Sequence, residues 1–253
     1  TPAGASEDSR YKKIVMHAER VDAMLVDVFL QSHPTPPQRI VIDLDSTFAP
    51  LHGHQLGRFF HGYYDCYCYL PLYVFCGEHL LAAKLRPSDI DGAYGALEVI
   101  QRIVEQIRAC WPEAPIVLRG DSGFCREPLM RWCEANTVDY LFGLAKNKRL
   151  VRIIGGELQQ AKLQCERTAA PARFFSEFAY RTQKSWSRSR RVVAKAEHLP
   201  KGSNPRFVVT SIPAEQFDAR TLYEQEYCAR GEMENRIKEQ QLDLFADRTS
   251  TAT

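Results

Sequence analysis

The sequence predicts an α/β fold in which a β-rich insertion precedes a last long helix. Short apolar runs with strand character alternate with amphipathic helical segments up to residue 171, and such alternation is typical of α/β proteins. Three strand-like runs then follow one another between residues 172 and 212. From Ala214 to about Phe245 the chain has no proline and a single glycine, which predicts a helix. We therefore expect a three-layer core.

The periodicity of apolar residues assigns the elements up to residue 110. Apolar side chains recur at helical spacing in residues 11–31, and the three prolines of HPTPPQ end this helix. The apolar run of residues 39–47 predicts a strand, and residues 67–75 and 79–86 predict an antiparallel meander. An apolar stripe predicts a helix over residues 89–110.

The second half continues the alternation and then changes character. The expected elements are strands at 115–121 and 138–145, helices at 127–136 and 147–166, and insertion strands at 172–180, 190–198 and 205–212. We divide the chain into an N-terminal helix with a proline-rich linker (1–36), the first part of the core (37–171), the β-rich insertion (172–212), and the last core helix with a polar tail (213–253).

Composition bounds the class of protein. The chain has 253 residues, 45% of them hydrophobic, and a net charge of +2, which fits a soluble globular protein. No apolar stretch approaches the roughly 20 residues that span a bilayer, and no secretory signal is visible. The nearly neutral charge leaves nucleic-acid binding to local clusters. The start at Thr1 and the polar ending suggest a fragment of a longer protein.

Eight cysteines are scattered along the chain without a C-x-x-C pair. They favour free thiols in a reducing, cytoplasmic compartment. His52 and His54, with Cys66 and Cys68 downstream, do not have a familiar zinc spacing, so turn and core packing is the preferred interpretation.

Two acids lie two residues apart at the end of the first predicted strand. Side chains of a strand alternate between faces, so Asp43 and Asp45 share one side while Ile42 and Leu44 enter the core. Carboxylates near apolar surroundings are costly unless they bind a cation. Solvated acids at a strand end, followed by a Ser-Thr turn, would explain the pair equally well.

Two further acids complete the candidate set. Asp121 follows an apolar run in LRGDSGF, where it could also simply cap a turn. Its RGD tripeptide is not interpreted as an adhesion motif, because nothing suggests secretion. One face of the last helix is expected to present Tyr227, Arg230, Glu234 and Lys238. Ordinary helix salt bridges would explain Glu234 alone, but acids from three separate elements are what Mg²⁺ ions and phosphodiester chemistry require.

A resemblance makes the pattern specific. The segments DLDST, HGHQ, YLPLYVF, LRPSD, LRGDSGF and YCARGEMENRIKE resemble, in this order, the DDE transposases of bacterial insertion sequences, in the branch with a β insertion before the last acid. The likeness covers about residues 39–242. The last helix of that family carries Tyr, two residues, Arg, three residues, Glu and, after six more, Lys. Tyr227, Arg230 and Glu234 match, whereas Gln241 holds the lysine position and Lys238 lies one turn after the glutamate.

The resemblance implies an RNase H-like core with the β-rich insertion before the last catalytic helix. It implies that Asp45, Asp121 and Glu234 are catalytic and hold two Mg²⁺ or Mn²⁺ ions, which cleave transposon-end DNA and transfer the strand into target DNA. Asp45 is preferred because Asp45-Ser46-Thr47 fits the family pattern of acid, small residue and threonine, and Asp43 is the alternate. Expected DNA contacts include Tyr227, Arg230 and Lys238. The implied setting is the bacterial cytoplasm, with a homodimer at synapsis and no membrane.

A basic aromatic stretch adds a second DNA hypothesis. Residues 180–195 carry six cations and no acid. Those proposed to bind DNA are Arg188, Arg190 and Arg191, with Trp186 stacking on an unpaired base; the remaining cations are Arg181, Lys184 and Lys195. A solvated hairpin whose tryptophan packs on its own sheet is the alternative. For the whole chain, the rivals are a nuclease of the same fold and an inactive, truncated DNA-binding remnant.

Overall fold

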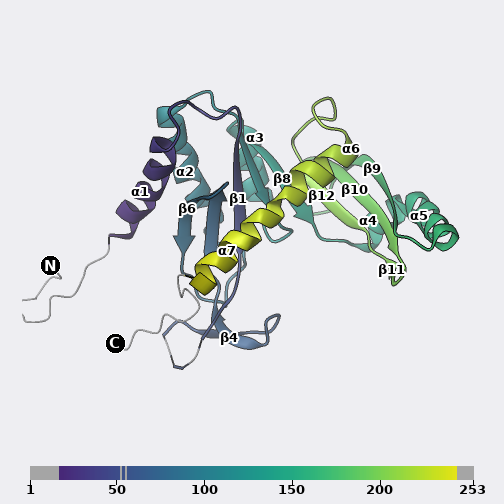
Figure 1. The fold of residues 1–253 in the computed structure, drawn as a ribbon, viewed down its shortest axis with the longest axis horizontal. Coiled ribbons are helices and arrows are strands. Elements are labelled where there is room, and N and C mark those ends of the chain that lie inside the picture. The colour runs from purple at the N-terminus through teal and green to yellow at the C-terminus, as the bar shows by residue number, and fades with distance from the viewer. Residues whose placement is uncertain (1–16, 52, 55, 244–253) are drawn as a thin grey trace, which may run out of the picture.

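A central mixed sheet flanked by helices organises the molecule (Figure 1). The structure is a computed structural model that describes residues 17–51, 53, 54 and 56–243. The helices are α1 (Ala18–Gln31), α2 (Ala96–Cys110), α3 (Glu127–Ala135), α4 (Lys148–Ile153), α5 (Gly155–Thr168), α6 (Ala219–Thr221) and α7 (Gly231–Asp243), with a π-helical segment (Leu222–Tyr227) and a 3-10 segment (Cys228–Arg230) before α7. The expected helical turns before residue 17 and after residue 243 lie outside the described residues.

The strands form two sheets. They are β1 (Ile40–Ser46), β2 (Ala49–Pro50), β3 (Phe59–His61), β4 (Cys66–Tyr69), β5 (Leu72–Cys76), β6 (His79–Lys84), β7 (Ile116–Gly120), β8 (Asp139–Leu144), β9 (Ala172–Tyr180), β10 (Arg190–Leu199), β11 (Gly202–Ser203) and β12 (Arg206–Thr210). The central sheet has the order β11-β10-β12-β8-β7-β1-β5-β6, with β9 paired to β10, and the small sheet has the order β2-β4-β3.

Strand directions in the central sheet are mixed. β1 runs parallel to β7, and β7 runs parallel to β8. β5 and β6 continue the sheet as an antiparallel pair beyond β1. On the other side, β12 is antiparallel to β8, so the β-rich residues 172–212 extend the central sheet. This mixed α/β architecture is compatible with an RNase H-like core.

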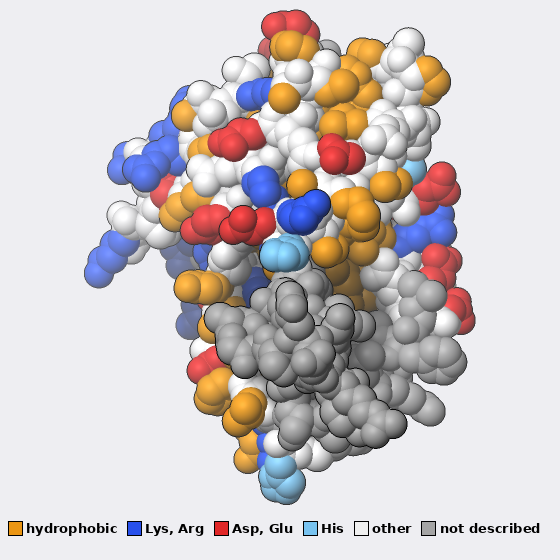
Figure 2. Space-filling model, turned by 90° about the vertical axis from the view of Figure 1, so that its left-hand side faces the viewer, with side chains coloured by type: hydrophobic (Ala, Val, Ile, Leu, Met, Phe, Trp, Pro, Cys, Tyr) orange, Lys and Arg blue, Asp and Glu red, His pale blue; other side chains and the backbone are white. Residues whose placement is uncertain are grey.

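Helices cover both faces of this sheet. One core cluster joins β1 side chains such as Ile42 and Leu44 with α1, α2 and α3. On the opposite face, Met233 and Ile237 of α7 pack on Tyr73 and Phe75 of β5, and Figure 1 shows α7 crossing the front of the sheet. The three-layer expectation is therefore confirmed. On the side of the molecule shown in Figure 2, acidic and basic side chains are intermixed, in keeping with the small net charge.

Several predicted boundaries were wrong. The run 67–75 divides at Pro71: β4 joins the small sheet and β5 the central sheet, because proline has no N–H for a ladder. The helix expected over 89–110 begins only at Ala96, after Gly95 in the left-handed conformation (φ 73°). The helix expected over 147–166 divides at Ile154 into α4 and α5.

Candidate functional site

The carboxyl ends of β1 and β7 lie side by side at one edge of the sheet. Their parallel register pairs Leu44 with Gly120, which makes the following residues, Asp45 and Asp121, neighbours. Burial raises the pKa of Asp45 to about 6; the positive charge of Arg230 opposes this rise, and the negative charges of Asp121 and Glu234 add to it. Asp45, Asp121 and Glu234 are therefore close enough for their charges to influence one another.

A tight turn holds Asp121 at the end of β7. The backbone N–H of Gly123 donates to Asp121 Oδ1 at 2.8 Å, and that of Phe124 donates to the Asp121 carbonyl at 3.2 Å. A Cβ on residue 123 would lie 2.9 Å from Asp121 Oδ1, so a larger residue there would displace the Asp121 carboxylate. The turn-capping role predicted from sequence is thus present, and it leaves Asp121 Oδ2 available.

Gly143 of β8 allows the last helical region to approach this turn. A Cβ at this position would lie 2.6 Å from the Tyr227 hydroxyl oxygen and 2.9 Å from the Ser122 backbone nitrogen. A Cβ atom essentially never comes that close to a non-bonded neighbour, so a larger residue would push Tyr227 away. Burial raises the pKa of Tyr227, and its hydroxyl therefore remains protonated near neutral pH.

Asp43 has a different environment from Asp45 although both lie on the same face of β1. Arg119, its register partner on β7, donates to both carboxylate oxygens, from Nε at 2.6 Å and from Nη2 at 2.8 Å. Arg119 Nη1 also donates to the Glu226 carbonyl at 2.6 Å. Asp43 and Arg119 are both buried. This pair ties β1 and β7 to the last helical region, and both Asp43 oxygens are already engaged.

Arg230 connects the strand acids to the helix acid. Its Nη2 donates to Glu234 Oε1 at 3.0 Å, and its Nη1 lies 3.8 Å from Asp45 Oδ1. Nη1 is buried without a hydrogen-bond partner among the described residues. The Arg230 guanidinium thus lies near the carboxylates of Asp45, Asp121 and Glu234, and its positive charge offsets their negative charges.

The helix that carries these residues is irregular. Where the sequence predicts one continuous helix from Ala214, the chain forms α6, then a π-helical segment that ends at Tyr227, a 3-10 segment that ends at Arg230, and α7. Such changes of helical type are frequent at functional sites. As a result Tyr227 and Arg230 are largely buried, whereas Glu234 and Lys238 are exposed. Gln241, which the resemblance noted in the sequence aligns with a lysine, donates to the Phe48 carbonyl at 3.4 Å.

The acids of the described residues are not arranged as a ready-made metal site. Across the described part of the chain, no group of three or more His, Cys, Asp or Glu side chains is close enough to hold a metal ion. The chemistry of the donors nevertheless fits Mg²⁺ or Mn²⁺, because carboxylate oxygens are the ligands these hard ions prefer. Arg230 bonds to Glu234 and faces Asp45. Drawing the acids around an ion requires that contact to change.

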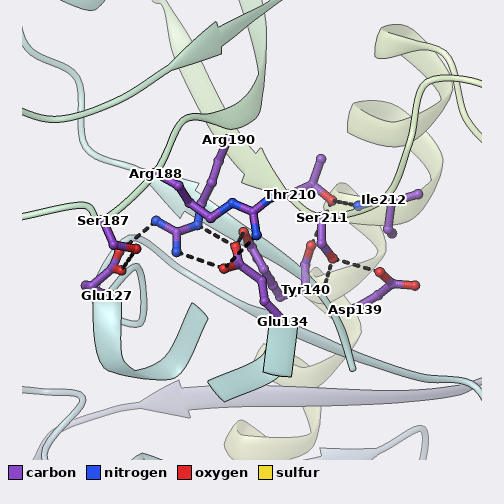
Figure 3. A network of polar contacts seen from close by, with 10 residues as sticks. All are labelled: Glu127, Glu134, Asp139, Tyr140, Ser187, Arg188, Arg190, Thr210, Ser211 and Ile212. Atoms are coloured by element: carbon purple, nitrogen blue, oxygen red, sulfur yellow. Dashed lines mark hydrogen bonds and ion pairs between the residues drawn. The ribbon is translucent and has the colours of Figure 1, made fainter. Parts of the chain in front are cut away.

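The basic stretch does not present the surface expected from the sequence. Trp186 is only 4% exposed and packs edge-on against Tyr180, so the prediction of an exposed, stacking tryptophan was wrong. Arg190 lies over the Trp186 ring. Its guanidinium also bonds to Glu127 at 2.7 Å and to Glu134 at 2.6 Å, as Figure 3 shows. The sequence stretch has no acid of its own, but α3 supplies two from 56 and 63 residues away.

Of the other two arginines proposed from the sequence to bind DNA, Arg191 is paired with an acid and Arg188 is exposed. Arg191 pairs with Glu177 of β9 and donates to the carbonyls of Ile212 and Phe217. Arg188 keeps a 66% exposed side chain, and its nearest acid, Glu134, is 3.8 Å away. Of the three arginines named from the sequence, Arg188 has the guanidinium that can reach a ligand in solution.

A cavity of about 300 Å³ adjoins Asp121 on the side of β8 and β12. Its wall includes Asp121, Gly143, Tyr227 and Arg230 of the acid site, and it adds Lys146, Arg206 and Tyr223, which the sequence analysis did not single out. One signal pointed to Lys146: it follows a strand parallel to β7, and the carboxyl ends of parallel strands meet at one edge. No comparable local signal marks Arg206.

The remaining expectations concern cysteines and membranes. All eight cysteines are free. Cys66 and Cys68 lie on β4 of the small sheet, and Cys68 is buried, as packing predicts; His52 lies outside the described residues. None of the described helices has the length and apolar character that a membrane crossing requires.

Comparison with known proteins identifies one family. A family model described as transposase DDE domain group 1 matches residues 3–253. A search of curated proteins finds no match.

Proposed function

The chain belongs to the family of transposase DDE domains, and on this basis we propose that it cleaves DNA at transposon ends and transfers the freed strand into target DNA. The observation that carries the proposal is geometric: Asp45 and Asp121 follow paired residues of two parallel strands, and Arg230 contacts Glu234 at 3.0 Å while lying 3.8 Å from Asp45. Acids from two adjacent parallel strands and a later helix thus lie around one arginine, Arg230.

Asp45, Asp121 and Glu234 are the residues that would hold Mg²⁺ or Mn²⁺. Two such ions, when bound, lower the pKa of the attacking water and stabilise the leaving oxygen of a phosphodiester. The free Oδ2 of Asp121 and the partly buried Asp45 carboxylate suit this role. Asp43 has a structural role in this proposal, because both its carboxylate oxygens accept hydrogen bonds from Arg119.

The neighbouring residues position the DNA strand in this proposal. Arg230 releases Glu234 and turns its guanidinium to a phosphate, since a guanidinium donates two parallel hydrogen bonds to phosphate as readily as to carboxylate. Tyr227, whose hydroxyl lies close to Gly143 and to the backbone of Asp121, presents a protonated hydroxyl to the DNA strand. Lys238 and Arg188 are exposed and provide contacts further along the DNA.

Nicking of a supercoiled plasmid in Mg²⁺ or Mn²⁺ tests the cleavage step. We expect D45N, D121N and E234Q each to abolish nicking, because each removes one negative ligand while keeping the shape of the side chain. E232Q is the matched control: Glu232 is an exposed acid in the first turn of the same helix as Glu234, and its loss should leave nicking intact. Wild-type activity in the three acid variants would exclude this site.

A joining assay separates a transposase from a nuclease of the same fold. Labelled DNA with a free 3′ hydroxyl is incubated with plasmid, and strand transfer produces a labelled plasmid. Nicking without joining would identify a nuclease, and the absence of both reactions in a folded protein would identify an inactive remnant. We also propose that two copies of the chain act together on two DNA ends, which a stoichiometry measurement on the DNA complex tests.

A further inference from the structure

The cavity beside Asp121 contains cations that the acid site does not use. We propose that Lys146 and Arg206 form a binding site for a backbone phosphate of the DNA strand that lies next to the cleaved phosphodiester. The proposal rests on the proposed function, and it assigns a task to a part of the molecule that the three acids leave unexplained.

Strand register brings the two cations together. β8 runs parallel to β7, so Lys146, two residues after the end of β8, lies at the same edge of the sheet as Asp121. β12 is antiparallel to β8 with Phe207 opposite Leu144. Arg206 at the start of β12 therefore lies opposite the residue that precedes Lys146. Both side chains line the cavity.

The charges in the cavity wall favour an anion. Its cations are Lys146, Arg206 and Arg230, and its one acid is Asp121. Lys146 and Arg206 are exposed, and neither forms an ion pair within the described part of the chain.

On the neighbouring strands, by contrast, the cations are paired with acids. Arg173, Arg190, Arg191 and Lys195 on β9 and β10 all form ion pairs with acids. Lys195 is even the register partner of Arg206 and pairs with Glu197 at 2.8 Å. Lys146 and Arg206, which line the cavity, have no such partner within the described residues.

The aromatic residues of the wall point to a phosphate rather than a stacked base. Tyr223 is 7% exposed and Phe207 is 3% exposed, so neither offers a free ring face. Tyr227, the third aromatic residue of the wall, is half-buried with its hydroxyl close to Gly143. A base would find at most one partly covered ring here, whereas a phosphate would find ammonium and guanidinium donors. The distance to the acids is short, because Asp121 and Arg230 belong to both the cavity and the acid site.

The salt dependence of DNA binding tests the assignment without catalysis. Binding of a fluorescent single-stranded oligonucleotide is measured by anisotropy in EDTA over a range of KCl concentrations. Each phosphate contact contributes about 0.7 to the slope of log affinity against log salt for single strands. We expect the K146Q/R206Q variant to bind more weakly and to lower that slope by about 0.7, because the two cations share one phosphate, whereas K146R/R206K keeps it.

The control is R167Q, which removes one exposed arginine of α5 and should bind like wild type. A slope for K146Q/R206Q equal to that of R167Q, or an absence of binding by the wild-type chain, would overturn the inference. A melting curve shows that each variant is folded. If K146Q/R206Q lowers the slope and wild type neither nicks nor joins DNA, the proposed function fails while the phosphate site stands.

Discussion

Asp43 and Arg119 form a buried pair across two adjacent parallel strands, with hydrogen bonds of 2.6 and 2.8 Å to the two carboxylate oxygens. Two residues further along the same strand, Asp45 has no such partner and instead faces Arg230, Asp121 and Glu234. One face of one strand therefore carries a structural acid and a candidate catalytic acid. The distinction between them is open to measurement.

Replacing Asp43 by alanine should destabilise the protein by about 3–5 kcal/mol, because Arg119 would be left buried without its counter-charge. Urea denaturation monitored by circular dichroism measures this. D45N is the comparison, and we expect it to cost little or to stabilise the metal-free protein, since it removes one of three neighbouring negative charges. Equal losses for the two variants would contradict the division of roles.

The stability of the metal-free protein should fall as the pH rises through the pKa of Asp45. That pKa is raised from its ordinary 3.8 to about 6, so the folded state holds a proton that the unfolded state releases. The stabilisation is complete below about pH 4 and is lost by about pH 6–7, by roughly 3 kcal/mol at most. Urea titrations in EDTA at several pH values measure it. D45N should lose this pH-dependent part of the stability, whereas E232Q should retain it. A pH profile of D45N like that of wild type would contradict the assignment to Asp45.

Arg230 should compete with a divalent ion for the acids. In R230Q the carboxylates of Asp45 and Glu234 lose their cation, so the metal-free variant should be less stable than wild type and should gain more from Mg²⁺. The measurement is the shift in melting temperature on adding Mg²⁺. R236Q is the matched control, since Arg236 lies on the same helix and pairs with exposed Glu239. Equal shifts in R230Q and R236Q would refute the competition.

Gly143→Ala should cost about 1–3 kcal/mol, because the added methyl group would overlap the Tyr227 hydroxyl and the Ser122 backbone. Y227F should recover part of the loss, since it removes the nearest atom. A double-mutant cycle on unfolding free energies quantifies this coupling. G156A is the control: its Cβ would meet nothing within 4 Å, and it lies within α5. Strictly additive effects of G143A and Y227F would show that the contact is unimportant.

Much of the fold was accessible from local pattern. Apolar periodicity located β1, β7, β8, β9, β10 and β12 to within a few residues, because strands and helices impose fixed spacings on the residues they bury. The errors occurred at glycine and proline. Pro71 separates β4 from β5, Gly95 delays the start of α2, and the last helical region changes type before Gly231. These are places where local geometry depends on what the chain packs against.

The basic stretch shows the limit of composition. Six cations without a nearby acid in sequence suggested a DNA surface, yet Glu127, Glu134 and Glu177 neutralise Arg190 and Arg191 in the folded chain. Conversely, Lys146 and Arg206 were not singled out from the sequence, and they line the cavity beside Asp121 without an ion pair among the described residues. Ion pairs form between residues that are near in space, and a sequence window shows only those that are near along the chain.

The sequence by itself determined the family, the acids Asp45 and Asp121 at predicted strand ends, and the Tyr227, Arg230 and Glu234 pattern of the last helix, because these depend on residue identity and spacing. Only the tertiary structure decided which of Asp43 and Asp45 is engaged by an arginine, and which cations remain without an acid partner. The physical reason is that the free energy of a charge depends on burial and on partners from other elements. Arg119, Arg230 and Glu134 reach their partners only when the sheet and the last helical region come together.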